Sequence, residues 1–169
     1  MSLFEMAMTN PGSPTPETTL IVCHLRKTSK GKLLFWSSFG DSYLFILRDG
    51  ELRQLNSLNP YWLGMLSKLS ENTEKKAIHL KYLSGDSRYV GVADGLETGI
   101  ENVQSGDVIF LCTDGLIGSD TEISEDMANN LKVILTSAAP LDVKVKELVL
   151  SALSRGEIDN VSCVVAWIK

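Results

Sequence analysis

One apolar run, together with the acidic turn that follows it, constrains the fold of this chain more than any other feature. Residues 108–112 read Val-Ile-Phe-Leu-Cys, a run of strand length with no polar residue to mark an exposed face. Such a run is typical of a strand that is buried on both faces. It ends at Thr113-Asp114-Gly115. Asp114 is therefore either an ordinary turn residue or a carboxylate that a rigid strand holds in place for binding.

The size and composition of the chain are those of a single globular domain. It has 169 residues, of which 44% are hydrophobic and 22% charged, and this is enough to bury a core. The net charge of −5 without a basic cluster argues against a nucleic acid or membrane partner. Residues 1–17 lack the pattern of a secretion signal. We therefore expect a cytoplasmic protein.

The three cysteines do not indicate a disulfide or a zinc site. Cys23, Cys112 and Cys163 each lie inside an apolar, strand-like run, and their odd number shows no paired spacing. We interpret them as small buried hydrophobic residues in a reducing compartment. His24 and His79 are isolated in the sequence, and neither is assigned a role.

The hydrophobic pattern predicts an α+β domain over residues 18–169, preceded by a proline-rich flexible leader over residues 1–17. Asp49-Gly50 predicts a hairpin turn, while Ser124 and Asp142 are expected to cap two helices, the second of which ends before Gly156. The predicted strands are residues 18–25, 33–39, 43–48, 51–55, 77–83, 88–93, 98–103, 108–112 and 161–168, with a further helix from residue 60. The first four strands are expected to form one antiparallel meander, and the last strand is expected to be central.

Three aspartates share one setting in this pattern. Asp41, Asp114 and Asp159 each lie at the predicted end of a strand. Carboxylates without histidine or thiolate partners favour hard cations such as Mg²⁺ or Mn²⁺. A pair of such ions can lower the pKa of a bound water and clamp a phosphoryl group. Aspartate beside Gly, Ser or Asn is also common in surface turns, so the spacing leaves both interpretations open.

Four blocks of the sequence follow one another in a recognisable order. They are residues 18–22, residues 39–55 with Gly40-Asp41-Ser42, residues 106–116 with Thr113-Asp114-Gly115, and residues 148–165 with Asp159-Asn160. Together these blocks resemble the metal-dependent Ser/Thr protein phosphatase family of the 2C type; any one block is a weak signal, whereas four in register are specific. The resemblance implies a sandwich of two mainly antiparallel sheets flanked by helices, and hydrolysis of phosphoserine or phosphothreonine by a metal-activated water.

The resemblance also implies roles for individual residues. Asp114 and Asp159 correspond to the ligands of the catalytic Mn²⁺ or Mg²⁺ ions, and Asp41 to a ligand of an additional metal site that shares Asp114. The neighbouring residues implied to support these ligands are Thr113, Gly115 and Asn160.

The chain departs from the family pattern before Thr18. The family's phosphate-gripping arginine and its Asp-Gly-x-Gly-Gly turn should stand there, and residues 1–17 supply neither. Asp94, in Val-Ala-Asp-Gly, resembles the bridging aspartate of that turn, but it follows the Gly-Asp-Ser block instead of preceding it. We favour a hairpin turn at Asp94. The resemblance therefore implies an N-terminally truncated form of the fold.

Two functional hypotheses follow. The first is a phosphatase that acts on a phosphorylated protein, with weak activity because part of the charge stabilisation at the phosphoryl group is missing. The second is a non-catalytic binding or scaffolding module, completed through an exposed sheet edge by a second copy of the chain or by a partner. An unrelated α+β domain is the least favoured alternative.

Overall fold

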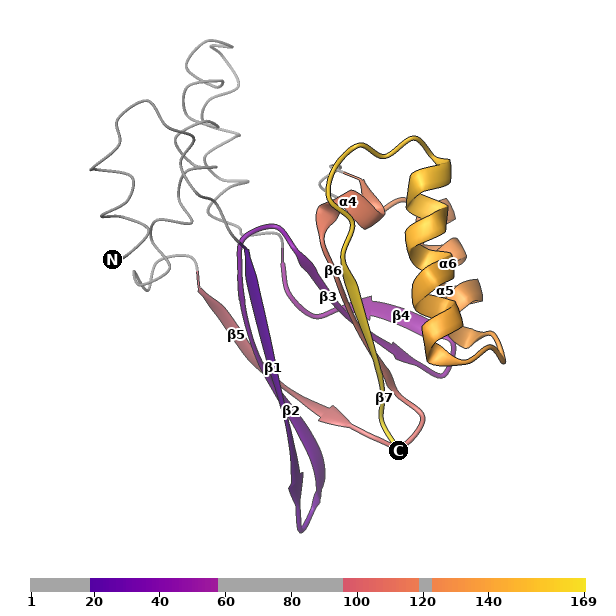
Figure 1. The fold of residues 1–169 in the computed structure, drawn as a ribbon. Coiled ribbons are helices and arrows are strands. Elements are labelled where there is room, and N and C mark those ends of the chain that lie inside the picture. Colours follow the sequence, from indigo (N-terminus) through magenta and orange to yellow (C-terminus); the bar gives the residue numbers. More distant parts are fainter. Residues whose placement is uncertain (1–18, 58–95, 119–122) are drawn as a thin grey trace, which may run out of the picture.

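The computed structural model describes residues 19–57, 96–118 and 123–169. Within these ranges the chain forms two antiparallel sheets and a helical layer (Figure 1). The three-stranded sheet has the order β1-β2-β5 and consists of β1 (Leu20–Thr28), β2 (Gly31–Phe39) and β5 (Glu97–Val103). The four-stranded sheet has the order β4-β3-β6-β7 and consists of β3 (Tyr43–Arg48), β4 (Glu51–Gln54), β6 (Val108–Cys112) and β7 (Cys163–Trp167). The helices are α4 (Asp114–Ile117), α5 (Glu125–Thr136) and α6 (Leu141–Ser154).

The four-stranded sheet separates two hydrophobic cores. On one face Phe45 and Phe110 pack with residues of α5 and α6, and their stacked rings lie 5.8 Å apart between centroids. On the other face Ile46 and Ile109 pack against Trp36 of the three-stranded sheet. The strand predicted from residues 108–112 is therefore buried on both faces, as expected. The predicted α+β sandwich is confirmed, with α5 and α6 against the four-stranded sheet (Figure 1).

Local turn and cap signals account for several boundaries. Asp49 and Gly50 both have positive φ, 51° and 79°, and they join β3 to β4 as the predicted hairpin turn. The Ser124 side chain accepts a hydrogen bond from the Met127 N–H and caps α5. The predicted cap at Asp142 is wrong. Helix α6 begins at Leu141 after Pro140, because the fixed φ of proline suits a helix start, and Asp142 lies in the first turn.

The predicted four-strand meander is wrong in one respect. The chain passes from β2 to β3 by changing sheets, so the first two strands pair in one sheet and the next two in the other. Gly40 lies at this crossing with φ of 96°, and a Cβ placed there would come within 2.6 Å of the Thr19 side chain. This backbone conformation favours glycine, and the sequence pattern alone does not show which sheet a strand joins.

The last strand is not central in the described part of the chain. β7 pairs with β6 and lies at the edge of the four-stranded sheet, where Val164 is 59% exposed and Trp167 is 53% exposed. A continuous apolar run does not distinguish a buried strand from an edge strand whose apolar side chains are exposed.

A buried ion pair fixes the loop that precedes β6. Asp107 is 1% exposed, and both of its carboxylate oxygens accept hydrogen bonds from the guanidinium of Arg48 at the end of β3. Asp107 also accepts a hydrogen bond from the Gln104 N–H. The pair joins residues 59 positions apart in the chain and was not anticipated from the sequence.

Several predicted features lie outside the described residues. They are the leader 1–17, the helix from residue 60, the strands 77–83 and 88–93, and Asp94. Of the helices that are described, none is both long enough and apolar enough to cross a membrane.

Candidate metal centre

Asp114 stands where β6 ends and the short helix α4 begins. Because β6 lies between β3 and β7, its end is held from both sides. One carboxylate oxygen of Asp114 accepts a hydrogen bond of 2.9 Å from the Gly115 N–H. The strand and this hydrogen bond together position the partly buried carboxylate predicted as a metal ligand.

The turn that carries Asp159 is clamped against the end of β6. The Thr113 hydroxyl donates to the Asn160 carbonyl at 3.0 Å and accepts from the Ser162 N–H at 3.0 Å. Gly115 packs so closely that a Cβ there would lie 2.7 Å from the Asn160 carbonyl oxygen. Thr113, Gly115 and Asn160, predicted as supporting residues, therefore connect the segments of Asp114 and Asp159.

Arg155 makes a further link between these segments. Its guanidinium donates to the Leu116 carbonyl of α4 at 2.6 Å and to the Ser151 hydroxyl at 2.9 Å. The C-terminal end of α6, which leads into the Asp159 turn, is thereby attached to α4. No spacing in the sequence pointed to this arginine.

Asp41 lies on the exposed crossing between β2 and β3, and a buried asparagine supports that crossing. Asn56 is 3% exposed. Its side-chain amide donates to the Ser42 carbonyl at 2.8 Å and to the Ser38 hydroxyl at 2.9 Å, and its oxygen accepts from the Leu44 N–H at 2.7 Å. Sequence reasoning missed Asn56, for which the only signal was a polar residue directly after the predicted strand 51–55.

The negative charges of Asp41 and Asp159 act on the carboxylate of Asp114. Burial raises the pKa of Asp114, as do the charges of Asp41 and Asp159, whereas the hydrogen bond from Gly115 opposes the rise. A divalent cation would relieve this repulsion, and carboxylate oxygens are the donors that Mg²⁺ and Mn²⁺ prefer. Within residues 19–57, 96–118 and 123–169, however, no three acidic, histidine or cysteine side chains lie close enough to hold one ion together. The donor chemistry of these carboxylates therefore suits a hard cation, whereas the described residues do not by themselves form a three-ligand site.

In the absence of divalent ions, Asp114→Asn should stabilise the protein at pH 7 by about 0.5 kcal/mol, the scale of interactions between partly exposed charges. Folding raises the pKa of the Asp114 carboxylate. Such a carboxylate lowers the stability of the folded state as the pH rises from the pKa of the unfolded chain, near 4, through the higher pKa of the folded protein. The stability gained by Asp114→Asn should vanish below about pH 3, where the wild-type carboxylate is protonated in both the folded and the unfolded protein. Urea unfolding in EDTA at pH 7 and pH 3 measures it, with Asp49→Asn as the control. A loss of stability at pH 7 would contradict the assigned repulsion.

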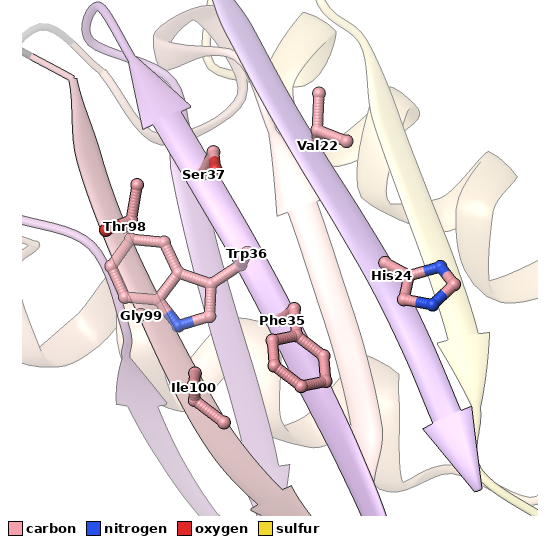
Figure 2. A pocket seen from close by; sticks show the side chains of 8 residues that line it. All are labelled: Val22, His24, Phe35, Trp36, Ser37, Thr98, Gly99 and Ile100. Carbon is pink, nitrogen blue, oxygen red and sulfur yellow. The ribbon is translucent and has the colours of Figure 1, made fainter. Parts of the chain in front are cut away.

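A separate hollow lies on the outer face of the three-stranded sheet (Figure 2). Its volume is about 540 Å³, and none of the three aspartates lines it. The His24 and Phe35 rings lie side by side there, with centroids 6.3 Å apart. The residues that line the hollow are Val22, His24, Phe35, Trp36, Ser37, Thr98, Gly99 and Ile100.

Solved structures of bacterial Ser/Thr phosphatases have the same fold as this chain. Stp1 from Staphylococcus aureus is 19% identical, with a TM-score of 0.68, over 99% of this chain and 62% of its own. Mycobacterium tuberculosis PstP is 22% identical, with a TM-score of 0.63, over 99% and 66%. PppA, a regulatory component of T6SS in Pseudomonas aeruginosa, is 24% identical, with a TM-score of 0.64, over 96% and 61%.

These similarities confirm the predicted relationship at the level of the fold. The chain spans less than two thirds of the length of each of these structures, consistent with the predicted truncation. No protein-family model matches the chain, and a comparison with curated proteins finds no match.

Proposed function

We propose that this chain is a Mn²⁺- or Mg²⁺-dependent phosphoserine/phosphothreonine protein phosphatase, or a truncated form of one with weak activity. The observation that carries the proposal is the hydrogen-bonded contact that holds the Asp159 turn against the end of β6, beside Asp114, within the fold of solved Ser/Thr phosphatases. One structure with this fold holds the catalytic domain of PstP in complex with two manganese ions.

The proposal gives each residue around Asp114 a role in metal binding or in positioning the ligands. Asp114 and Asp159 would hold the catalytic Mn²⁺ or Mg²⁺ ions, and Asp41 would contribute to an additional metal site shared with Asp114. Thr113 and Gly115 keep the Asp159 turn against the end of β6. When bound, Mn²⁺ or Mg²⁺ supplies an activated water and neutralises charge on the phosphoryl group of a phosphorylated protein.

Mn²⁺-dependent hydrolysis of p-nitrophenyl phosphate tests the catalytic proposal. The wild-type chain should show slow, Mn²⁺-dependent turnover, and Asp114→Asn should reduce the rate by about 100-fold, the scale of losing one preorganised group that stabilises the transition state. Asp49→Asn, in the hairpin turn between β3 and β4, should retain the wild-type rate. Equal rates for the wild type and Asp114→Asn would contradict the proposal.

The alternative function is a non-catalytic module that a second copy or a partner completes. The exposed apolar residues on the edge strands favour it: Val22 on β1 is 50% exposed, and Val164 on β7 is 59% exposed. Among the described residues, β1 and β7 each pair with a strand on one side alone, and such strand edges favour pairing with another chain. Light scattering during gel filtration distinguishes a monomer from a dimer. A monomer whose melting temperature does not rise with Mn²⁺ would contradict both self-association and metal binding.

A further inference from the structure

Two of the three cysteines, separated by 50 residues in the sequence, stand opposite each other in the four-stranded sheet. Cys112 ends β6, Cys163 begins β7, and the antiparallel register pairs them directly. Both side chains belong to the face that α5 and α6 cover: Cys112 is buried in that core, and Cys163 packs against it half-buried. The two thiols therefore share one face of neighbouring strands.

The backbone hydrogen bonds show which kind of pair this is. In an antiparallel ladder, hydrogen-bonded and non-hydrogen-bonded pairs alternate. Thr113 and Ser162 form a hydrogen-bonded pair one step beyond the cysteines, since the Thr113 N–H donates to the Ser162 carbonyl at 3.0 Å. At the other end of the ladder, Ile168 N–H donates to the Asp107 carbonyl at 2.9 Å. Counting inward from either end places Cys112 and Cys163 at a non-hydrogen-bonded pair.

This kind of pair suits a disulfide. Cα atoms at non-hydrogen-bonded pairs lie about 4.5 Å apart with their side chains close together, and disulfides join Cα atoms roughly 4.4–6.8 Å apart. We propose that Cys112 and Cys163 form a cross-strand disulfide when a peroxide oxidises the protein, and that this bond covalently links β7 to β6.

The reaction balances with hydrogen peroxide as the oxidant. The more accessible Cys163 sulfur attacks the peroxide, the O–O bond breaks, and Cys163 sulfenic acid and water form. The Cys112 sulfur then attacks the sulfenic sulfur, an S–S bond forms, and the oxygen leaves as a second water. Burial raises the pKa of the Cys163 thiol, so the first step is slower than at an activated cysteine.

The bond would act on the strands that carry the candidate ligands. Within the described residues β7 is paired on one side by β6, and the Asp159 turn precedes it. A disulfide closing the loop between residues 112 and 163 restricts the unfolded chain and holds the edge strand in register. The inference goes beyond the proposed function and does not depend on metal binding.

Oxidation of the full chain tests the proposal. After treatment with hydrogen peroxide, free thiols should fall from three to one, the intact mass should fall by two hydrogens, and proteolysis should yield a peptide joining Cys112 to Cys163. The oxidised protein should melt higher by on the order of 5–10 °C, and dithiothreitol should reverse the shift. Cys23→Ser should lose both of its two free thiols and keep the mass change, the linked peptide and the reversible shift in melting temperature.

Variants make the outcome decisive. Cys163→Ser, at the half-buried position, should abolish the mass loss and the shift in melting temperature, as should Cys112→Ser where it folds. A linked peptide containing Cys23, a disulfide-bonded dimer, or a mass gain of oxygen without cross-linking would overturn the proposal.

Discussion

Replacing Asp107 with asparagine should lower the free energy of unfolding at pH 7 by about 3 kcal/mol, because removing one partner of a buried ion pair leaves the other uncompensated. Arg48 donates to both oxygens of Asp107, at 2.9 Å and 2.7 Å. Asparagine cannot accept both of these hydrogen bonds, and Gln104 loses a charged acceptor for its N–H. Arg48 is 33% exposed, so water can partly solvate its charge. The cost should therefore lie near the lower end of the range for buried pairs.

The same substitution should change the acid sensitivity of the protein. Burial raises the pKa of Asp107, but the hydrogen bonds from Arg48 and Gln104 and the charge of Arg48 outweigh burial and hold that pKa below its usual range. A lowered pKa gives stability that is present above the unfolded pKa, near 4, and is lost as the pH falls through the folded pKa. The difference in free energy of unfolding between the wild type and Asp107→Asn should therefore be largest at pH 7 and should shrink below about pH 4.

Urea unfolding at pH 7 and at pH 3 measures both effects. The matched control is Glu101→Gln, which removes the ion pair between Glu101 and Arg53, a residue whose side chain is 56% exposed. Because water reaches the Arg53 side chain, that pair should contribute no more than about 1 kcal/mol. Equal losses for the two variants would show that the buried pair does not fix the loop before β6.

Gly115→Ala should lower the free energy of unfolding by about 2 kcal/mol, the scale of overpacking a tight contact. The added Cβ would lie 2.7 Å from the Asn160 carbonyl oxygen and 3.3 Å from the Asp159 Cβ, so backbone must move. The expected direction is opposite to the usual gain when alanine replaces a helical glycine. The displaced turn carries Asp159, and the affinity for Mn²⁺ should therefore also fall.

Two measurements separate these effects of Gly115→Ala. Urea unfolding in EDTA reports the packing cost alone, and the Mn²⁺-induced rise in melting temperature reports the metal centre. A variant that is as stable as the wild type, with an unchanged response to Mn²⁺, would show that Gly115 does not hold the Asp159 turn in place.

Features encoded by neighbouring residues could be predicted from the sequence. The run at residues 108–112 forms the buried strand β6, Ser124 caps α5, and Asp49-Gly50 forms the hairpin turn. In each case the chemistry that determines the structure lies within a few residues. The same holds for Asp114, which the sequence placed at the end of a rigid strand.

Features that depend on register between distant segments could not be predicted in this way. The pairing of Cys112 with Cys163 follows from how β6 and β7 align, and the Arg48–Asp107 pair joins a hairpin to a loop 59 residues later. At the change of sheet, Gly40 lies against Thr19, which is distant in the sequence. Local periodicity contains no information on any of these contacts.

Calorimetric titration of the chain with Mn²⁺ tests the central claim, that Asp114 is the main carboxylate of a metal centre. The wild type should bind Mn²⁺, Asp114→Asn should weaken binding by roughly 100-fold, equivalent to about 2.7 kcal/mol, and Asp49→Asn should leave binding unchanged. Absence of binding by the wild type, or equal affinities for the wild type and Asp114→Asn, would contradict the claim.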